Sequence, residues 1–237
     1  MKKRKKRRIN IMTEENRKIY DATKIKECFG SGHFTQDTEW SDLPDEVRSM
    51  QMSYPIHAVL MGFVVDEFMK VVDGSYGVAT VTDVGSGTGM FLNYVREKHS
   101  LHRIEKYTGY EIVEKFAKKL DKKIRKLQVN GAVEVVDFFE ANPVKSDFVI
   151  ASQCLNTVFS EEPYAFIEMA VEKLWNSCKK VLVFDLKDTD APRKSETRTY
   201  YNPVTVYSIC RKYTQNVKIV QLTKANFAVV MSRDPLY

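Results

Sequence analysis

The residues best suited to chemistry lie in the segment Asp83-Val-Gly85-Ser-Gly87-Thr-Gly89. An apolar run precedes the segment and an amphipathic stretch follows it, so we expect it to be the turn between a strand and a helix. Alternating glycines let the backbone turn tightly and approach a ligand, and the amides of a helix N-terminus face the same space. An ordinary loop does not need three such glycines behind an acid. The segment therefore predicts a binding site for a nucleotide-like cofactor.

The spacing of the glycines excludes two common phosphate-binding motifs. The dinucleotide fingerprint G-x-G-x-x-G requires glycine or alanine three residues after Gly87, where this chain has Met90. A P-loop requires G-K-[ST], which does not follow. The pattern here is instead an acidic residue followed by G-x-G-x-G.

The elements that must position this turn alternate between strand and helix patterns. Strands are expected at 79–84, 106–111, 132–137, 147–152, 180–186, 217–222 and 226–232, and helices at 89–98, 113–127 and 161–176. The last two strands are separated by three residues, which suits an antiparallel hairpin and is too short for a helical crossover. The order predicts an α/β fold: a doubly wound, seven-stranded, mostly parallel sheet that ends in an antiparallel hairpin.

Composition divides the chain into three parts. The chain has 37 Lys and Arg against 31 Asp and Glu, a formal charge of +6, but residues 2–8 (KKRKKRR) hold seven of the basic residues. Residues 9–237 therefore hold 30 basic and 31 acidic residues, which sum to −1. We expect a disordered basic tail at 1–8, a helical cap at 9–78 and a cofactor-binding core at 79–237.

Other sequence signals concern location and metals. No apolar run is long enough to span a membrane, and no apolar stretch of a secretory signal follows the basic start, so a cytoplasmic protein is expected, or a nuclear one in a eukaryotic host. The four cysteines are widely spaced without a C-x-x-C pair, which predicts reduced thiols, mostly buried, and no metal site. The oligomeric state is left open.

The acidic residue, the G-x-G-x-G turn and the final hairpin together resemble the class I S-adenosylmethionine-dependent methyltransferases. The resemblance implies a Rossmann-like methyltransferase fold and S-adenosyl-L-methionine as the cofactor. It places Asp83 near the amino group of the methionine moiety, Glu111 on the ribose hydroxyls, and Asp137 with Phe138 at the adenine. Carboxylates suit the first three roles because they accept hydrogen bonds from hydroxyls and amines. The expected cofactor-binding residues are Asp83, Gly85, Ser86, Gly87, Gly89, Glu111, Asp137, Phe138 and Ser152.

A finer resemblance is to a little-characterised bacterial and phage branch of these enzymes. It rests on Trp40 and Gln51 ahead of the first strand, on the A-S-x-x-x-N segment at 151–156, and on the Tyr-Tyr-x-Pro element at 200–203. The branch implies no substrate.

The acceptor site is expected in the crevice after the fourth strand. We predict His57 and Asn156 as catalytic residues, and Tyr54, Gln153 and Tyr200 as substrate contacts. His57 would act as a general base or a substrate contact because it titrates near neutrality, although a core or surface histidine explains it as well. Asn156 could equally cap the next helix, and Tyr200 could lie in a solvated loop. Asp137 could likewise serve only as a turn cap.

Three functions remain open at the level of sequence. The first is a methyltransferase acting on an oxygen or nitrogen of a small molecule. The second is an RNA or DNA methyltransferase that uses residues 2–8 and the basic helix at 113–127 for phosphate contacts. The third is a non-catalytic binding subunit with the same fold. The base-methylating motif [DNS]-P-P-[YFW] and the Pro-Cys nucleophile of cytosine C5 enzymes are both absent after the fourth strand.

Overall fold

The computed structural model describes residues 54–75, 77–156, 161–195 and 198–235. Its strands are β1 (Ala79–Val84), β2 (Ile104–Glu111), β3 (Gly131–Val135), β4 (Ser146–Ala151), β5 (Cys178–Lys187), β6 (Val217–Thr223) and β7 (Asn226–Ser232). Its helices are α4 (Tyr54–Asp73), α5 (Met90–Glu97), α6 (Glu114–Lys126), α7 (Pro163–Ser177) and α8 (Pro203–Cys210), with a 3₁₀ turn, η2 (Leu101–Arg103). The basic tail, Trp40, Gln51 and the cap residues before Tyr54 lie outside the described residues.

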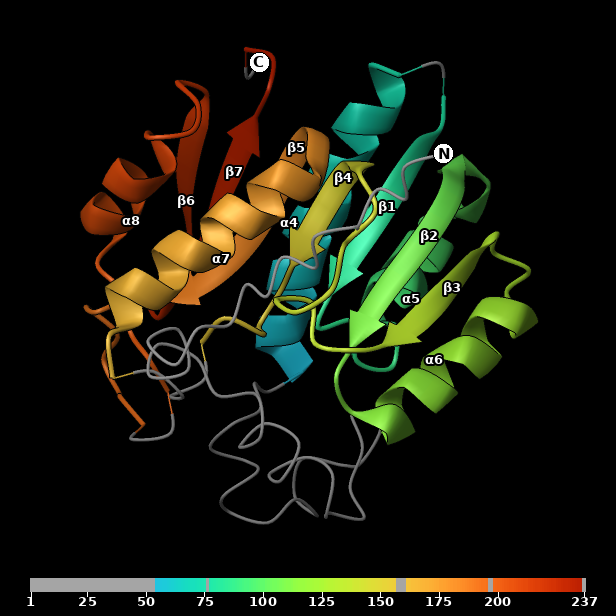
Figure 1. Cartoon of the computed structure of the whole chain (residues 1–237), viewed down its shortest axis with the longest axis horizontal. Coiled ribbons are helices and arrows are strands. Elements are labelled where there is room, and N and C mark those ends of the chain that lie inside the picture. Colours follow the sequence, from blue (N-terminus) through green and yellow to red (C-terminus); the bar gives the residue numbers. More distant parts are fainter. Residues whose placement is uncertain (1–53, 76, 157–160, 196–197, 236–237) are drawn as a thin grey trace, which may run out of the picture.

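The seven strands form one sheet in the order β3-β2-β1-β4-β5-β7-β6 (Figure 1). The first five of these positions pair in parallel, whereas β7 runs antiparallel to both β5 and β6. The strand direction reverses because β6 and β7 are joined by two residues only, which permits a hairpin and no crossover. The predicted α/β sheet with a terminal antiparallel hairpin is confirmed.

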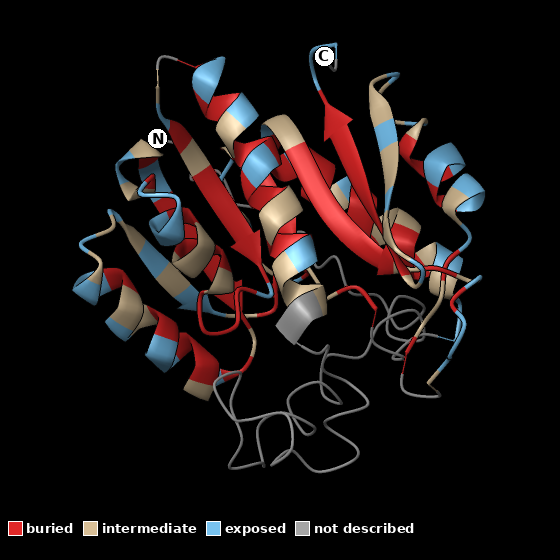
Figure 2. Cartoon of the chain, turned by 180° about the vertical axis from the view of Figure 1, so that it is seen from behind, coloured by how far each residue is buried: buried red, intermediate tan, exposed pale blue. Residues whose placement is uncertain are grey.

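Two apolar clusters lie on opposite faces of this sheet. One includes side chains of α4, α5 and α6, and the other those of α7 and α8. Seen from behind, the central strands are buried along most of their length, whereas the edge strands β3 and β6 are partly exposed (Figure 2). Helix α6 illustrates the sequence basis: its buried residues Phe116, Leu120 and Ile124 recur every four residues, and most of its lysines are exposed. Within the described ranges, no helix combines the length and apolar character that a membrane span needs.

Two features differ from the sequence expectation. Strand β3 ends at Val135, so Asp137 lies in the turn beyond it rather than on the strand. The connection after β5 was expected to be a loop, but it contains helix α8, which begins with Pro203 behind Asn202. The Asn202 side chain accepts hydrogen bonds from the next two free backbone amides, and proline suits the first helical position. The connection from β3 to β4 contains no helix, as the sequence predicted.

Candidate active site

The glycine turn between β1 and α5 is anchored to the neighbouring strand. The backbone amides of Gly85 and Ser86 both donate to the carbonyl oxygen of Tyr110 on β2, at 2.9 and 3.1 Å. Gly85, Gly87 and Gly89 have φ values of 65°, 54° and 83°, a region that side-chain-bearing residues rarely adopt. The three glycines are therefore needed for the backbone path itself, and the turn lies at the carboxyl edge of the sheet.

Glu111, the last residue of β2, holds the same turn from the side. One of its carboxylate oxygens accepts from the Gly87 amide at 2.7 Å, and the other accepts from the Val113 amide at 2.8 Å. Burial raises the pKa of Glu111, and these backbone hydrogen bonds oppose that rise. Each carboxylate oxygen has a second lone pair, so Glu111 can still accept hydrogen bonds from two ligand hydroxyls.

Asp83 lies beneath the turn and is 5% exposed. Its Oδ2 accepts a 2.7 Å hydrogen bond from the phenolic hydroxyl of Tyr107 on β2. Burial raises the pKa of Asp83 to about 7; the Tyr107 hydrogen bond opposes this rise, and the charge of Glu111 adds to it. A carboxyl group held this way favours a cationic partner, because a positive charge would restore its ionised form.

The residues expected at the adenine end are both buried. The Oδ1 of Asp137 accepts from the Phe139 amide at 2.8 Å, which is the turn-capping role considered from sequence. Phe138 packs edge-on against Tyr110 and Phe139, and the Lys173 ammonium lies 5.9 Å from its ring centroid. Their contacts with a cofactor remain predictions.

The segment after β4 is organised by Asp185, a residue of β5. The Oδ1 of Asp185 accepts from the Ser152 hydroxyl at 2.6 Å and from the Gln153 amide at 3.0 Å. These bonds hold Gln153 at a φ of 62°. Asp185 is 1% exposed, and burial raises its pKa to about 6 against the opposing effect of those two hydrogen bonds. Ser152 thus turns toward β5, and its predicted cofactor contact remains a prediction.

The structure brings His57 and Gln153 together. The Nε2 of Gln153 lies 3.0 Å from Nδ1 of His57 on helix α4, across 96 positions of sequence. Because an amide nitrogen only donates, Nδ1 accepts and the ring proton lies on Nε2. The roles predicted for His57, a general base or a substrate contact, stay predictions. Tyr54 begins the same helix.

The glycine turn and the segment after β4 are in direct contact. A Cβ added at Gly85 would lie 2.5 Å from the Cβ of Cys154, so only glycine fits there. Cys154 itself is half-buried, and its thiol donates to the Val84 carbonyl at 3.3 Å. Its pKa is raised well above the ordinary value, first by burial and then by the charges of Asp185, Asp83 and Glu111. The glycine turn and the segment after β4, where the acceptor is expected, therefore form one continuous site.

Asn156 is 1% exposed, and its side chain forms two hydrogen bonds with the backbone of β5. Its Oδ1 accepts from the Lys187 amide at 2.7 Å, and its Nδ2 donates to the Asp185 carbonyl at 3.4 Å. It does not cap α7, since the cap residue of that helix is Glu162. This geometry supports a positioning role, and the catalytic role stays untested.

Tyr200 lies in the connection between β5 and α8. Its hydroxyl accepts from the Ser195 amide at 2.7 Å, and the Lys194 ammonium lies 5.7 Å from its ring centroid. The next residue, Tyr201, is fully buried, and its hydroxyl donates to the Leu155 carbonyl at 3.3 Å. The connection is thus tied to the segment after β4, as a wall of an acceptor site would be.

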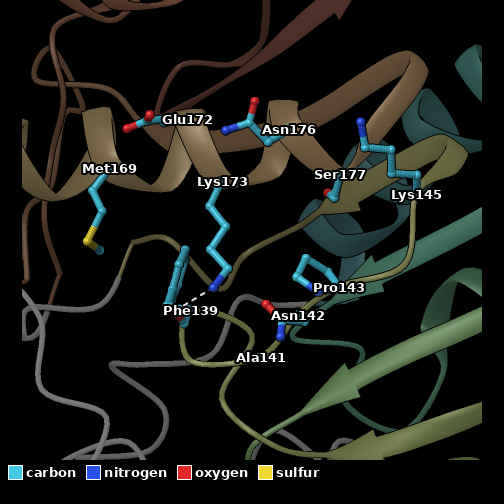
Figure 3. A pocket seen from close by; sticks show the side chains of 10 residues that line it. All are labelled: Phe139, Ala141, Asn142, Pro143, Lys145, Met169, Glu172, Lys173, Asn176 and Ser177. Atoms are coloured by element: carbon cyan, nitrogen blue, oxygen red, sulfur yellow. Dashed lines mark hydrogen bonds between the residues drawn. The ribbon is translucent and has the colours of Figure 1, made fainter. Parts of the chain in front are cut away.

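A separate pocket of about 460 Å³ lies between helix α7 and the β3–β4 connection (Figure 3). Lys173 crosses it and donates to the Phe139 carbonyl at 2.6 Å. The lining residues are Phe139, Ala141, Asn142, Pro143, Lys145, Met169, Glu172, Lys173, Asn176 and Ser177. None of the residues predicted from sequence lines this pocket.

Sequence reasoning missed two residues of the site, Tyr107 and Asp185. Asp185 lies inside an apolar strand and Tyr107 inside the strand KYTGYE at 106–111, so each was taken as an ordinary strand residue. The signal was available for Asp185: in VLVFDLK it is the one acidic residue of a buried strand, near its carboxyl end. Nothing in the sequence marked Tyr107, because tyrosine is common in strands.

Comparison with known proteins agrees with this geometry. A family model described as "Methyltransferase domain" matches residues 82–185. None of the curated proteins compared matches the chain.

Several solved structures share the fold. Magnesium protoporphyrin IX methyltransferase from Synechocystis PCC 6803, with bound SAH, is 16% identical, with 90% of this chain and 100% of that chain covered and a TM-score of 0.62. The N-methyltransferase NodS from Bradyrhizobium japonicum WM9 is 12% identical, with 78% and 99% covered and a TM-score of 0.54. An S-adenosylmethionine-dependent methyltransferase from Clostridium acetobutylicum is 10% identical, with 79% and 95% covered and a TM-score of 0.53. At these identities the likeness establishes the fold alone. In the sequence of residues 82–185 and in its fold, the chain thus resembles the class I S-adenosylmethionine-dependent methyltransferases.

Proposed function

We propose that this protein is an S-adenosylmethionine-dependent methyltransferase that moves a methyl group to an oxygen or nitrogen of a small-molecule acceptor. One observation carries the proposal: Asp83 and Glu111, at the ends of adjacent strands, flank a glycine turn whose Gly87 amide is bound by Glu111. This set offers a buried carboxyl for a cation, a carboxylate for a diol and an open backbone for close approach.

The residues present fit the cofactor part by part. Asp83 would receive the amino group, because its buried carboxyl is stabilised by a positive charge. Glu111 would accept the ribose hydroxyls with its remaining lone pairs, and Asp137 and Phe138 would lie at the adenine. Magnesium protoporphyrin IX methyltransferase, which has this fold, has been crystallised with SAM and with SAH, which supports the same cofactor here.

The chemistry asks little of the protein beyond positioning. The sulfonium supplies an activated methyl group, and the electron pair of the broken bond stays on sulfur as a neutral thioether. The acceptor oxygen or nitrogen gives up its proton to water or to buffer as the new bond forms. The protein must align donor and acceptor and exclude water. In the best-oriented reactions, such alignment lowers the activation barrier by about 7 kcal/mol or more. His57, Gln153, Asn156 and Tyr200 are our candidates for that alignment.

Calorimetry with S-adenosylmethionine tests the proposal directly. We expect binding by the full chain and a loss of at least about tenfold in affinity for Asp83→Ala, because a charge-assisted contact is removed. Absence of binding, or equal binding by the variant, would remove the enzyme assignment and leave a non-catalytic binding subunit.

A nucleic-acid acceptor is the second candidate, and helix α6 supports it. The helix exposes Lys118, Lys119, Lys122 and Lys126, and it packs beside the glycine turn through Lys123, which donates to the Gly89 carbonyl at 3.4 Å. Deleting residues 2–8 and measuring methylation of RNA and DNA at rising salt separates the two candidates. If turnover falls and its salt dependence flattens, a polyanion is the acceptor. If neither nucleic acid is methylated, the small-molecule proposal stands.

A further inference from the structure

A group of polar side chains meets at the carboxyl end of β5, next to the segment after β4. Asp185 and Lys187 are two residues apart on β5 and therefore share one face of the sheet. Asn226, the first residue of β7, is paired directly with Lys187 and lies on that face too. Ser152 binds Asp185, and Arg198 interacts with it electrostatically. We name these five residues the β5 polar cluster: Ser152, Asp185, Lys187, Arg198 and Asn226.

Two atoms of the β5 polar cluster are buried without a hydrogen bond. Among the described residues, neither Oδ2 of Asp185 nor Nδ2 of Asn226 has a partner. Asp185 is 1% exposed and Asn226 is fully buried. A buried polar atom without a partner costs about 1–3 kcal/mol, so two of them in one cluster call for a functional explanation. Oδ2 of Asp185 accepts a hydrogen bond and Nδ2 of Asn226 donates one. A ligand that carries both a donor and an acceptor would satisfy both atoms.

The charges of the β5 polar cluster do not cancel. Within the cluster, Lys187 and Arg198 interact with the carboxylate of Asp185, so these three side chains sum to +1 when all are ionised. Burial lowers the pKa of Arg198 to about 10, which keeps it charged at neutral pH, and burial also lowers the pKa of Lys187. The charge of Arg198 also lowers the pKa of Lys187, and the charges of both cations lower the pKa of Asp185. An anionic group would relieve this excess of positive charge.

We propose that the β5 polar cluster is the acceptor subsite, and that it binds an anionic molecule bearing a hydroxyl or amine. The hydroxyl or amine donates to Oδ2 of Asp185, and the anionic group lies against Lys187, Arg198 and the amide of Asn226. The inference rests on the proposed methyltransferase function.

The position of the β5 polar cluster suits an acceptor. Open parallel sheets bind ligands outside the carboxyl ends of their strands, and the cluster lies at the carboxyl ends of β4 and β5. Through Ser152 and the Gln153 amide, Asp185 also sets the segment that carries Gln153 to His57. Cys154 interacts electrostatically with both Asp185 and Asp83, so the subsite adjoins the place proposed for the methionine moiety.

Ligand-observed NMR on the full chain saturated with SAH tests this inference. The probes are para-hydroxybenzoate, para-aminobenzoate and para-hydroxyphenyl phosphate, which carry both a donor and an anion. Phenol and aniline carry the donor alone, and benzoate carries the anion alone. We expect at least one of the first three to bind more tightly than its single-group counterparts, and the carboxylate and phosphate probes separate the two kinds of anion.

Two variants assign the contacts. Asp185→Asn keeps the Oδ1 that binds Ser152 and Gln153 but replaces the acceptor Oδ2 with a donor. Lys187→Gln removes one cation. Each should weaken the preferred probe by about tenfold, whereas Lys218→Gln on the exposed edge of β6 should not change its affinity. Lys187→Gln keeps the test decisive if Asp185→Asn does not fold.

The outcomes separate this inference from the proposed function. SAH affinity, measured by calorimetry, should be equal in the wild type, Lys187→Gln and Lys218→Gln. If SAH does not bind the wild type, the proposed function fails. The inference fails on its own if SAH binds but the two-group probes do not bind, or bind no better than phenol and benzoate. It also fails if these probes bind equally to the wild type and both cluster variants. In each case, water satisfies the two unpartnered atoms.

Discussion

The hydroxyl of Tyr107 donates a 2.7 Å hydrogen bond to Oδ2 of Asp83, and both side chains are buried. Among the described residues this is the hydrogen bond that the Asp83 side chain receives. It opposes the rise in the pKa of Asp83 that burial causes. Tyr107 therefore controls how readily the carboxyl that would meet the cofactor becomes charged.

Replacing Tyr107 with Phe should raise the pKa of Asp83 further and weaken S-adenosylmethionine binding at about pH 7. A hydrogen bond to a charged group contributes roughly 1.5–3 kcal/mol, so we expect a loss of about tenfold or more by calorimetry. Tyr110→Phe is the matched control, because its hydroxyl binds the Val144 amide at 3.1 Å, away from Asp83. Equal losses in both variants would show that packing, and not Asp83, is responsible.

Asp83→Asn should be more stable than the wild type at about pH 8. The folded-state pKa of Asp83 is raised from 3.8 to about 7, so the neutral form favours folding. That contribution is fully present below pH 3.8 and is lost as the pH rises through about 7. The variant stays neutral, so its advantage should grow across this window to a few kcal/mol, about 4 at most. Thermal unfolding at about pH 4 and pH 8 measures it, and a constant difference would contradict the assigned pKa.

S-adenosylmethionine binding at about pH 6 should release a proton. At that pH the Asp83 carboxyl is mostly protonated, and a cationic amino group beside it favours the ionised form. Calorimetry in two buffers with different ionisation enthalpies should therefore give different heats. Asp83→Asn provides the control, since it has no proton to release. Proton release that persists in this variant would have to come from another group.

Glu111→Gln should weaken cofactor binding and also loosen the glycine turn. The amide can accept at one position only, so one of the bonds from Gly87 and Val113 is lost. We expect a loss of about tenfold or more in affinity for S-adenosylmethionine and a lower melting temperature, the latter restored only in part by saturating cofactor. Glu134→Gln on β3 is exposed and should change neither quantity. A fall in stability without a fall in affinity would make Glu111 a purely structural residue.

The sequence predicted the fold well because the pattern of strands and helices follows local rules. The terminal hairpin and the buried stripe of α6 can be recognised from spacing alone, although the connection of the hairpin has two residues and not the three expected. Helix α8 was missed although Asn202 and Pro203 mark its start, since its apolar residues show little periodicity. The two missed site residues act across strands: Tyr107 reaches Asp83 over 24 positions, and Asp185 reaches Ser152 over 33. Such contacts depend on strand order, which periodicity does not encode.

The contact between Gly85 and Cys154 bears on how this protein can change during evolution. The glycine turn and the segment after β4 can touch because Gly85 has no Cβ. The main chain of Gly85 and the Cβ of Cys154 therefore fix the distance between the two segments, and no larger side chain at position 85 can change it. New acceptors would have to arise by exchanges elsewhere in the site, at positions such as His57 and Gln153, while the contact between Gly85 and Cys154 stays unchanged.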